Sequence, residues 1–226
     1  ENYFYSKNNF EEKVHIIPPW STTKNFKKNE SSFFSEKYKK KDLFLRIIYS
    51  GNIGVTHPLE NIIYSIPNIK NKAKCIISGN GAKLDKLKRI SKGLNLSSDD
   101  LKFLDFIDSE EEFFYFLSNA DFSVVALDEK LGGSSLPSKI FNSLELGVPI
   151  IGITSENSSV ANLIKKYKCG INIPPDAKFK LKLDFFIEKV CNEKKFLQNL
   201  KINAKKASIQ FTVKNAEKLT NLFLDC

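Results

Sequence analysis

The chain has 226 residues, 42% of them hydrophobic and 27% charged, and this ordinary globular composition argues against wholesale disorder. Lys and Arg number 35 against 26 Asp and Glu, and the net charge of +9 suits a phosphate-bearing partner or an anionic membrane surface. No apolar run reaches the roughly 18–20 residues of a spanning helix, and no signal peptide opens the chain. We therefore expect a cytoplasmic protein, and a peripheral location at the inner face of the membrane is compatible with the charge.

Cysteine and histidine usage argues against a metal site. The four cysteines are scattered without a C-x-x-C pair, and the chain has two histidines. A zinc site or a disulfide framework needs tighter clustering, so we expect reduced thiols and no metal. Methionine is absent and the chain begins at Glu1, so we expect a processed chain or an excised piece of a longer protein.

The first 42 residues differ in composition from the rest. They are polar and aromatic, with two consecutive prolines in residues 16–20 that hold the backbone extended. Residues 37–41 form a lysine-rich run, which we interpret as a solvated or membrane-surface patch. We interpret residues 1–42 as an interdomain linker and the end of a missing N-terminal domain.

From residue 43 onward, short runs rich in Ile and Val alternate with segments of helical periodicity. The predicted strands are 44–49, 74–78, 103–107, 122–127, 148–153 and 170–173. The predicted helices are 57–66, 82–90, one that starts after Ser109 with Glu110, Glu111 and Glu112 in its first turn, 138–146 and 158–167. This alternation predicts an α/β fold with a doubly wound, mostly parallel, Rossmann-like sheet over 43–178. Residues 179–226 read as two lysine-rich amphipathic helices that pack on it.

Glycines and small polar residues follow three of the predicted strands. Gly51 and Gly54 follow the first, Gly79 and Gly81 the second, and a Gly-Ser stretch after the fourth leads into Lys139. Ligands of parallel sheets bind outside the carboxyl ends of the strands. Lys139 in the first turn of a helix opposes the helix dipole, and a bound phosphate would explain it. The alternative is that each glycine turn is a tight connection; His57 reads as a capping or surface histidine.

The order of these motifs resembles a known family. Residues 49–54 (Tyr-Ser-Gly-Asn-Ile-Gly) with 57–60, then 77–81, 106–107 and 136–149, resemble the C-terminal domain of family 4 glycosyltransferases of the GT-B fold. The last segment is similar to their donor-binding signature in the lipopolysaccharide and capsule branch. Residues 16–20 resemble the segment that joins the two domains.

The resemblance implies a retaining glycosyltransferase that uses no metal. It would move a hexose-type sugar from a UDP- or GDP-linked donor to a glycan or lipid-linked acceptor in cell-surface polysaccharide synthesis. Lys139 would be the catalytic residue, and Ile107 would lie near the base. The implied donor-binding residues are Gly51, Asn52, Gly54, Gly79, Asn80, Gly81, Ile107, Ser134, Ser135, Leu136, Pro137, Ser138, Lys139 and Asn142.

Two departures from the family pattern stand out. The family has two acidic residues eight positions apart, the later of which holds the ribose; here these positions fall on Ser134 and Asn142, with Glu145 one turn further along. We also expect the acceptor domain to be missing, because 15 residues precede the joining segment. We therefore expect a donor-binding half, inactive alone, or a free-standing chain that pairs with a separate acceptor subunit.

Two alternatives stay open at this point. A nucleotide-sugar 2-epimerase shares the GT-B architecture but needs acid–base carboxylates and histidines in its cleft. A basic nucleic-acid-binding module would explain the charge, but the lysines mingle with acids and follow no recognised motif, so we expect no nucleic-acid partner.

Overall fold

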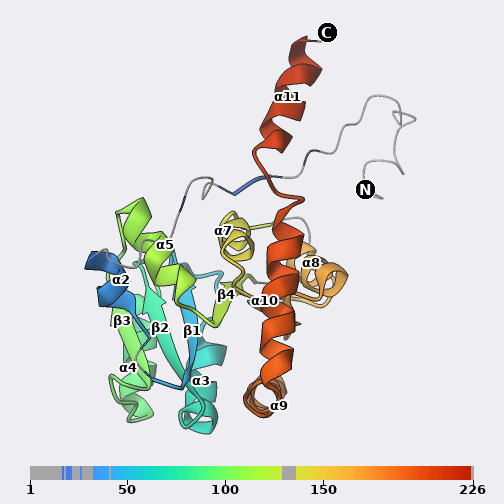
Figure 1. Cartoon of the computed structure of the whole chain (residues 1–226). Coiled ribbons are helices and arrows are strands. Elements are labelled where there is room, and N and C mark those ends of the chain that lie inside the picture. Colours follow the sequence, from blue (N-terminus) through green and yellow to red (C-terminus); the bar gives the residue numbers. More distant parts are fainter. Residues whose placement is uncertain are drawn as a thin grey trace.

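The computed structural model describes residues 17, 19–21, 26, 33–40, 42–128 and 136–224, the side chains as far as residue 221. Within this part of the chain, six strands form one sheet in the order β3-β2-β1-β4-β5-β6 (Figure 1). Every neighbouring pair is parallel. The predicted doubly wound parallel sheet is therefore confirmed, and its strand order reverses direction between β1 and β4.

The strand positions agree with the predicted runs except at β3. The strands are β1 (Leu45–Ser50), β2 (Ala73–Ser78), β3 (Leu101–Leu104), β4 (Phe122–Ala126), β5 (Ile150–Ile153) and β6 (Gly170–Asn172). The expected strand over 103–107 is wrong, because β3 pairs with β2 from Leu101 to Leu104 and ends where β2 ends. Beyond that point the Ser78 hydroxyl donates to the Asp105 carbonyl at 2.8 Å, and the chain leaves the sheet.

Helices cover both faces of the sheet. The helices of the described chain are α2 (Phe33–Tyr38), α3 (Glu60–Ile69), α4 (Leu84–Gly93), α5 (Glu110–Ser118), α7 (Lys139–Glu145), α8 (Ser159–Tyr167), α9 (Phe179–Asn192), α10 (Lys194–Ser208) and α11 (Lys214–Leu224). Because successive strand residues point to opposite faces, Val124 of β4 packs with α3 and α9, whereas Val125 packs with α7 and α8. The predicted cap at Ser109 is confirmed, since its hydroxyl accepts from the Glu112 N–H.

The tail contains three described helices, so the expectation of two is wrong. Glu193, with φ −116° and ψ 82°, ends α9 and begins α10. Between α10 and α11 the chain turns because the Phe211 ring enters the core, 4.8 Å from the Phe141 ring centroid. α10 lies along the sheet domain, and α11 projects beyond it (Figure 1).

The described part of the segment before residue 43 is more ordered than a linker requires. α2 packs against α5, and the Lys37 ammonium pairs with Glu112 on that helix. Lys40 is half-buried and pairs with Asp121 at 2.6 Å, so the interpretation of residues 37–41 as a solvated patch is wrong for Lys40, whereas Lys37 and Lys39 are exposed as that interpretation expects. Ile16, Pro18 and Lys41 lie outside the described residues.

The remaining expectations concern cysteines and membrane spans. Cys75, Cys169 and Cys191 are free thiols, and Cys226 lies outside the described residues. None of the helices in the described part of the chain combines the length and the apolar character needed to cross a membrane.

Candidate functional site

The site lies where the order of the sheet reverses, at the carboxyl ends of β1 and β4. The loop of residues 51–54 follows β1, and α7 begins after β4 with Lys139 as its first residue. Gly51 has a φ of +131°, and a Cβ on it would lie 2.9 Å from the Lys139 Nζ. A glycine at this position therefore leaves room for the lysine, and the predicted pair of Gly51 and Lys139 lies together.

Lys139 is held against an aromatic ring. Its Nζ lies 4.2 Å from the centroid of the Tyr49 ring, a cation–π distance. Within the described part of the chain it forms no ion pair, and burial lowers its pKa to about 8. Desolvation without a carboxylate partner disfavours the charged form, so an anion bound beside this ammonium would offset the cost.

The side chains of Tyr49 and His57 form hydrogen bonds with the backbone of the loop of residues 51–54. The Tyr49 hydroxyl donates to the Asn52 carbonyl and lies 3.3 Å from His57 Nδ1. The Gly54 N–H donates to the same nitrogen at 3.1 Å. His57 is half-buried, and its pKa is lowered by burial and then by the charge of Lys139. The interpretation of His57 as a helix cap is wrong for α3, whose N-cap is Leu59, and the side chain is half-buried rather than fully exposed.

The second glycine loop packs directly against the first. A Cβ on Gly79, whose φ is +135°, would overlap the Gly51 carbonyl oxygen, and one on Gly81 would lie 2.6 Å from the Ile53 carbonyl oxygen. The Ile53 N–H donates to the Asn80 carbonyl at 2.7 Å. Close packing between the two loops is enough to explain why glycine stands at these positions. Gly79 and Gly81 therefore support the loop of residues 51–54.

The segment that leads into α7 is partly described. Leu136 and Pro137 are half-buried, Ser138 is exposed, and the Ser138 side chain does not cap the helix. The Ile140 N–H donates to the Pro137 carbonyl at 3.1 Å, which starts the helical turn. Ser134 and Ser135 lie outside the described residues.

Asn142, at the position where the family has its ribose-binding acid, contacts Ser21 in the segment that precedes the sheet domain. Asn142 Oδ1 accepts from the Ser21 hydroxyl at 3.1 Å, and the Ser21 N–H donates to the Phe211 carbonyl at 3.0 Å. Glu145 pairs with Lys205 of α10 at 2.7 Å. Because Glu145 turns to α10, it does not replace the missing acid near Lys139.

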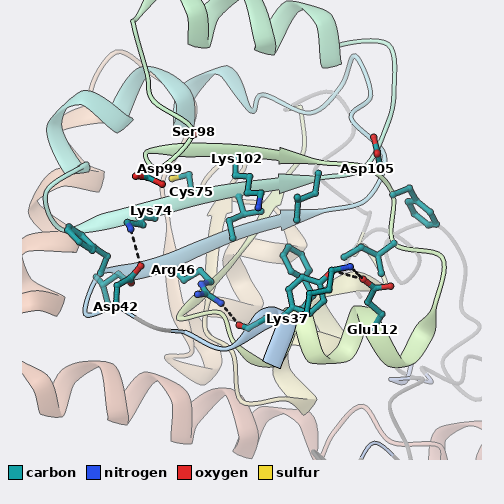
Figure 2. A pocket seen from close by; sticks show the side chains of 18 of the residues that line it. Lys37, Asp42, Arg46, Lys74, Cys75, Ser98, Asp99, Lys102, Asp105 and Glu112 are labelled. Atoms are coloured by element: carbon teal, nitrogen blue, oxygen red, sulfur yellow. Dashed lines mark hydrogen bonds and ion pairs between the residues drawn. The ribbon is translucent and has the colours of Figure 1, made fainter. Parts of the chain in front are cut away.

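A separate hollow of about 720 Å³ lies on the α5 side of β1, β2 and β3 (Figure 2). Of its cations, Lys74 pairs with Asp42 at 3.0 Å, the Arg46 guanidinium donates to the Tyr38 carbonyl at 2.7 Å, and Lys102 is exposed to solvent. These contacts distinguish the hollow from the Lys139 position, which has no such anionic partner among the described residues. The hollow is therefore the weaker candidate for a phosphate site.

The hollow reaches the segment that would read the base. Phe106 and Ile107 line it, just beyond the end of β3. Ile107 is half-buried and packs with the α5 core, whereas Phe106 is 58% exposed. The sequence pattern pointed to residues 106–107 and to Ile107 in particular, and the structure shows that Phe106 is the exposed ring of this segment.

The described residues at this edge include no cluster of metal ligands. Across the described residues, no group of three or more His, Cys, Asp or Glu side chains lies close enough to hold a metal ion. The cationic group that the described site offers to an anion is the Lys139 ammonium.

A match to a known protein family identifies the family of this chain. The pattern of the family described as glycosyl transferases group 1 matches residues 28–207. The chain belongs to this family. The predicted glycosyltransferase family is therefore confirmed, and the match to a transferase family disfavours the epimerase and nucleic-acid alternatives.

Individual relatives agree with the family. Probable glycosyltransferase WbjE of Pseudomonas aeruginosa is 29% identical over 129 residues, which cover 57% of this chain and 32% of WbjE. WaaG, a glycosyltransferase involved in lipopolysaccharide biosynthesis, superposes with a TM-score of 0.68 at 15% identity, over 88% of this chain and 52% of WaaG. Anabaena HepE in complex with UDP gives a TM-score of 0.67 at 14% identity, over 81% and 50% of the two chains. The chain thus spans about a third of WbjE and about half of the two solved chains.

Proposed function

We propose that this chain is the nucleotide-sugar-binding half of a retaining glycosyltransferase that builds a cell-surface polysaccharide. The observation that carries the proposal is the position of Lys139. Its ammonium lies beside Gly51 at the point where the sheet reverses order, partly buried and without an ion pair among the described residues. A nucleoside diphosphate supplies the negative charge that this position lacks.

The proposed chemistry follows from charge. When a glycosyl group leaves a nucleotide-sugar, the departing diphosphate gains negative charge, and a cation placed there in advance stabilises the transition state. Lys139 takes this role in the proposal, in place of a metal ion. The backbone of Gly51, Asn52 and Gly54 lies against the diphosphate, and Ile107 lies near the base.

The proposed donor is UDP- or GDP-linked and the transferred group is a hexose-type sugar. HepE, which shares the fold, was solved with UDP, and WaaG takes part in lipopolysaccharide biosynthesis. A glycan or lipid-linked acceptor would be bound by an N-terminal domain, in the same longer chain or in a separate subunit. We assign residues 1–42 to the connection, 43–178 to the donor domain and 179–226 to the helices on it.

Calorimetric titration of this chain with UDP, GDP, ADP and inorganic phosphate tests the donor assignment. We expect one nucleoside diphosphate to bind and phosphate alone to bind far more weakly. Lys139→Met should weaken that binding by about 10- to 100-fold, because a hydrogen bond to a charged group contributes roughly 1.5–3 kcal/mol. Lys195→Met is the matched control: it makes the same change at an exposed lysine of α10 and should not alter binding.

Two outcomes would contradict the proposal. One is that no nucleoside diphosphate binds the folded chain; the other is that Lys139→Met and Lys195→Met have the same effect. The retaining mechanism needs its own test on the full-length protein, in which proton NMR of the first product compares its anomeric configuration with that of the donor sugar. An inverted product would contradict that part.

A further inference from the structure

The contacts under the loop of residues 51–54 require a particular protonation state of His57. Nδ1 of this histidine accepts a hydrogen bond from the Gly54 N–H at 3.1 Å. A ring nitrogen accepts only when it carries no proton, so the imidazole in this arrangement is neutral. The Tyr49 hydroxyl, 3.3 Å from the same nitrogen, donates to the Asn52 carbonyl. His57 and Tyr49 therefore each form a hydrogen bond with one backbone group of this four-residue loop, the Gly54 N–H and the Asn52 carbonyl.

The path of this loop sets the space beside Lys139. A Cβ on Gly54 would lie 3.1 Å from the Asn52 amide nitrogen and 3.4 Å from His57 Nδ1, so the turn closes tightly around the imidazole. The same loop carries Gly51, whose Cα faces the Lys139 ammonium. A change in the turn at Gly54 therefore moves the backbone that lies against Lys139.

We infer that His57 is a positioning residue for the donor: its neutral imidazole, together with Tyr49, keeps residues 51–54 in the conformation that accepts a nucleoside diphosphate. The inference rests on the proposed function and assigns to this pair a role in it. Protonation of His57 places an N–H donor opposite the Gly54 N–H donor, and the loop loses its support. Donor binding therefore falls when His57 becomes charged.

Charged groups face His57 from several neighbouring elements. Lys139 approaches from α7, and the Lys83 ammonium, just before α4, donates to the His57 carbonyl at 2.8 Å. Glu60 of α3 pairs with Lys83 at 2.7 Å and with Lys86 at 2.9 Å. The two lysines that act on the imidazole both disfavour a further positive charge.

Two further residues lie near His57: Asp128, just after β4, and Tyr49 of β1. The Asp128 N–H donates to the Thr56 carbonyl at 2.7 Å, and Asp128 itself is exposed. Tyr49 of β1 has a pKa raised by burial, so its hydroxyl stays protonated and continues to donate. The His57 pKa is lowered by burial first and by Lys139 next, and these effects outweigh a backbone hydrogen bond with Asn52 that raises it. His57 is therefore neutral near pH 7.5 and gains its proton as the pH falls below its ordinary range.

The direction of the pH effect separates this role from simple electrostatics. A positive charge on His57 would by itself attract an anionic donor and strengthen binding in acid. Loss of the acceptor for the Gly54 N–H predicts the opposite, weaker binding in acid. A structural histidine without influence on the loop predicts no difference between the wild type and a variant that does not titrate.

The experiment measures binding of UDP and GDP by calorimetry from pH 5.5 to 8 for the wild type, His57→Asn and His57→Ala. The Asn Oδ1 lies about where Nδ1 lies and accepts from an N–H, but it does not titrate in this range. At pH 7.5 we expect His57→Asn to retain binding within about threefold and His57→Ala to lose about tenfold or more. As the pH falls, the wild type should weaken relative to His57→Asn; the ratio cancels protonation of the ligand's own phosphate.

A second measurement reads the histidine itself. The chain has two histidines, His15 and His57, so His57→Asn assigns the imidazole signals in a nitrogen NMR titration. We expect the His57 ring to stay neutral to a pH below the ordinary range of histidine, and the Gly54 amide signal to shift as His57 titrates. Thermal melts confirm that each variant is folded.

Three results would overturn the inference: a ratio of wild-type to His57→Asn affinity that does not change with pH, stronger wild-type binding in acid, or normal binding by folded His57→Ala. If the wild type binds neither UDP nor GDP at any pH, the proposed function fails first. The failure of the inference and the failure of the function are thus distinguishable.

Discussion

The backbone of Gly79 lies so close to that of Gly51 that a side chain on Gly79 would overlap the Gly51 carbonyl oxygen. The Gly51 N–H donates to the Ser78 carbonyl at 3.0 Å, which fixes the two loops side by side at the ends of β1 and β2. The loop that bears the candidate site is therefore supported by a second loop, and its position depends on a residue without a Cβ.

Gly79→Ala should destabilise the fold severely, by about 3 kcal/mol or more, because it combines steric overlap with a left-handed φ. The fall in the free energy of unfolding is measured by urea denaturation. Gly93→Ala is the matched control: Gly93 ends α4 and no atom lies within 4 Å of its Cβ position. That variant should equal or exceed the wild type, and equal losses in both variants would contradict the packing argument.

Gly51→Ala should act on the site more than on the fold. Its Cβ would meet the end of a flexible lysine side chain at 2.9 Å, and the ammonium can move away. We expect a loss of stability of about 1–2 kcal/mol from the left-handed φ, smaller than for Gly79→Ala, together with a loss of nucleoside diphosphate binding. Urea denaturation and calorimetry on the same samples check both parts; a folded variant with unchanged affinity would contradict the second.

Lys139→Met should raise the melting temperature of the free chain at pH 7 while it weakens donor binding. The folded-state pKa of Lys139 is about 8, below its ordinary 10.5, so the cost of its charge is fully present below pH 8. That cost disappears as the pH rises toward 10.5, where the lysine of the unfolded chain also loses its proton. The gain from methionine should therefore be largest near pH 7, about a few degrees, and should shrink in alkali. Calorimetric melts at pH 7 and pH 10 measure it.

Donor binding should weaken as the pH rises above about 8, because the free Lys139 ammonium, with its pKa of about 8, then loses its proton. Binding of a diphosphate favours the charged form, so complex formation above pH 8 takes up a proton. Affinities measured at pH 7, 8 and 9 should fall for the wild type and stay nearly constant for Lys139→Met. A parallel decline in both would assign the effect to another group.

Asp121 connects three elements, and Asp121→Asn should destabilise the fold by about 2 kcal/mol. Its carboxylate accepts from Lys201 of α10 at 2.8 Å, from Lys40 at 2.6 Å and from the Arg46 N–H at 3.0 Å. Burial raises its pKa, but these partners outweigh burial and lower it. The stabilisation is thus present above about pH 4 and is lost as the pH falls through the lowered pKa.

Urea denaturation at pH 7 and at pH 3 measures the effect of Asp121→Asn. The matched control is Glu36→Gln, which removes an exposed carboxylate that pairs with Lys39 at 3.0 Å. Such surface pairs contribute about 0–1 kcal/mol, so the control should change little. A loss at pH 3 as large as that at pH 7 would show that the charge of Asp121 is not responsible.

Local patterns in the sequence were sufficient for the sheet and most of its helices. Buried parallel strands require unbroken apolar runs, and the helices between them require apolar residues every three or four positions. The prediction failed at β3, whose end is set by the length of β2, and at α10–α11, where the position of Phe211 in the core divides the tail. Neither cause is visible within the segment concerned.

The candidate site was likewise predictable from the sequence only in part. The pattern of strands and glycines was enough to place the glycine loops and Lys139 at one edge of a parallel sheet, because strand polarity puts all carboxyl ends together. Only the tertiary structure brought the Tyr49 ring under Lys139, joined His57 to Gly54 and turned Asn142 toward Ser21. These contacts depend on how β1, α7 and the segment before residue 43 pack against one another, and side-chain partners from separate elements leave no periodic pattern in the chain.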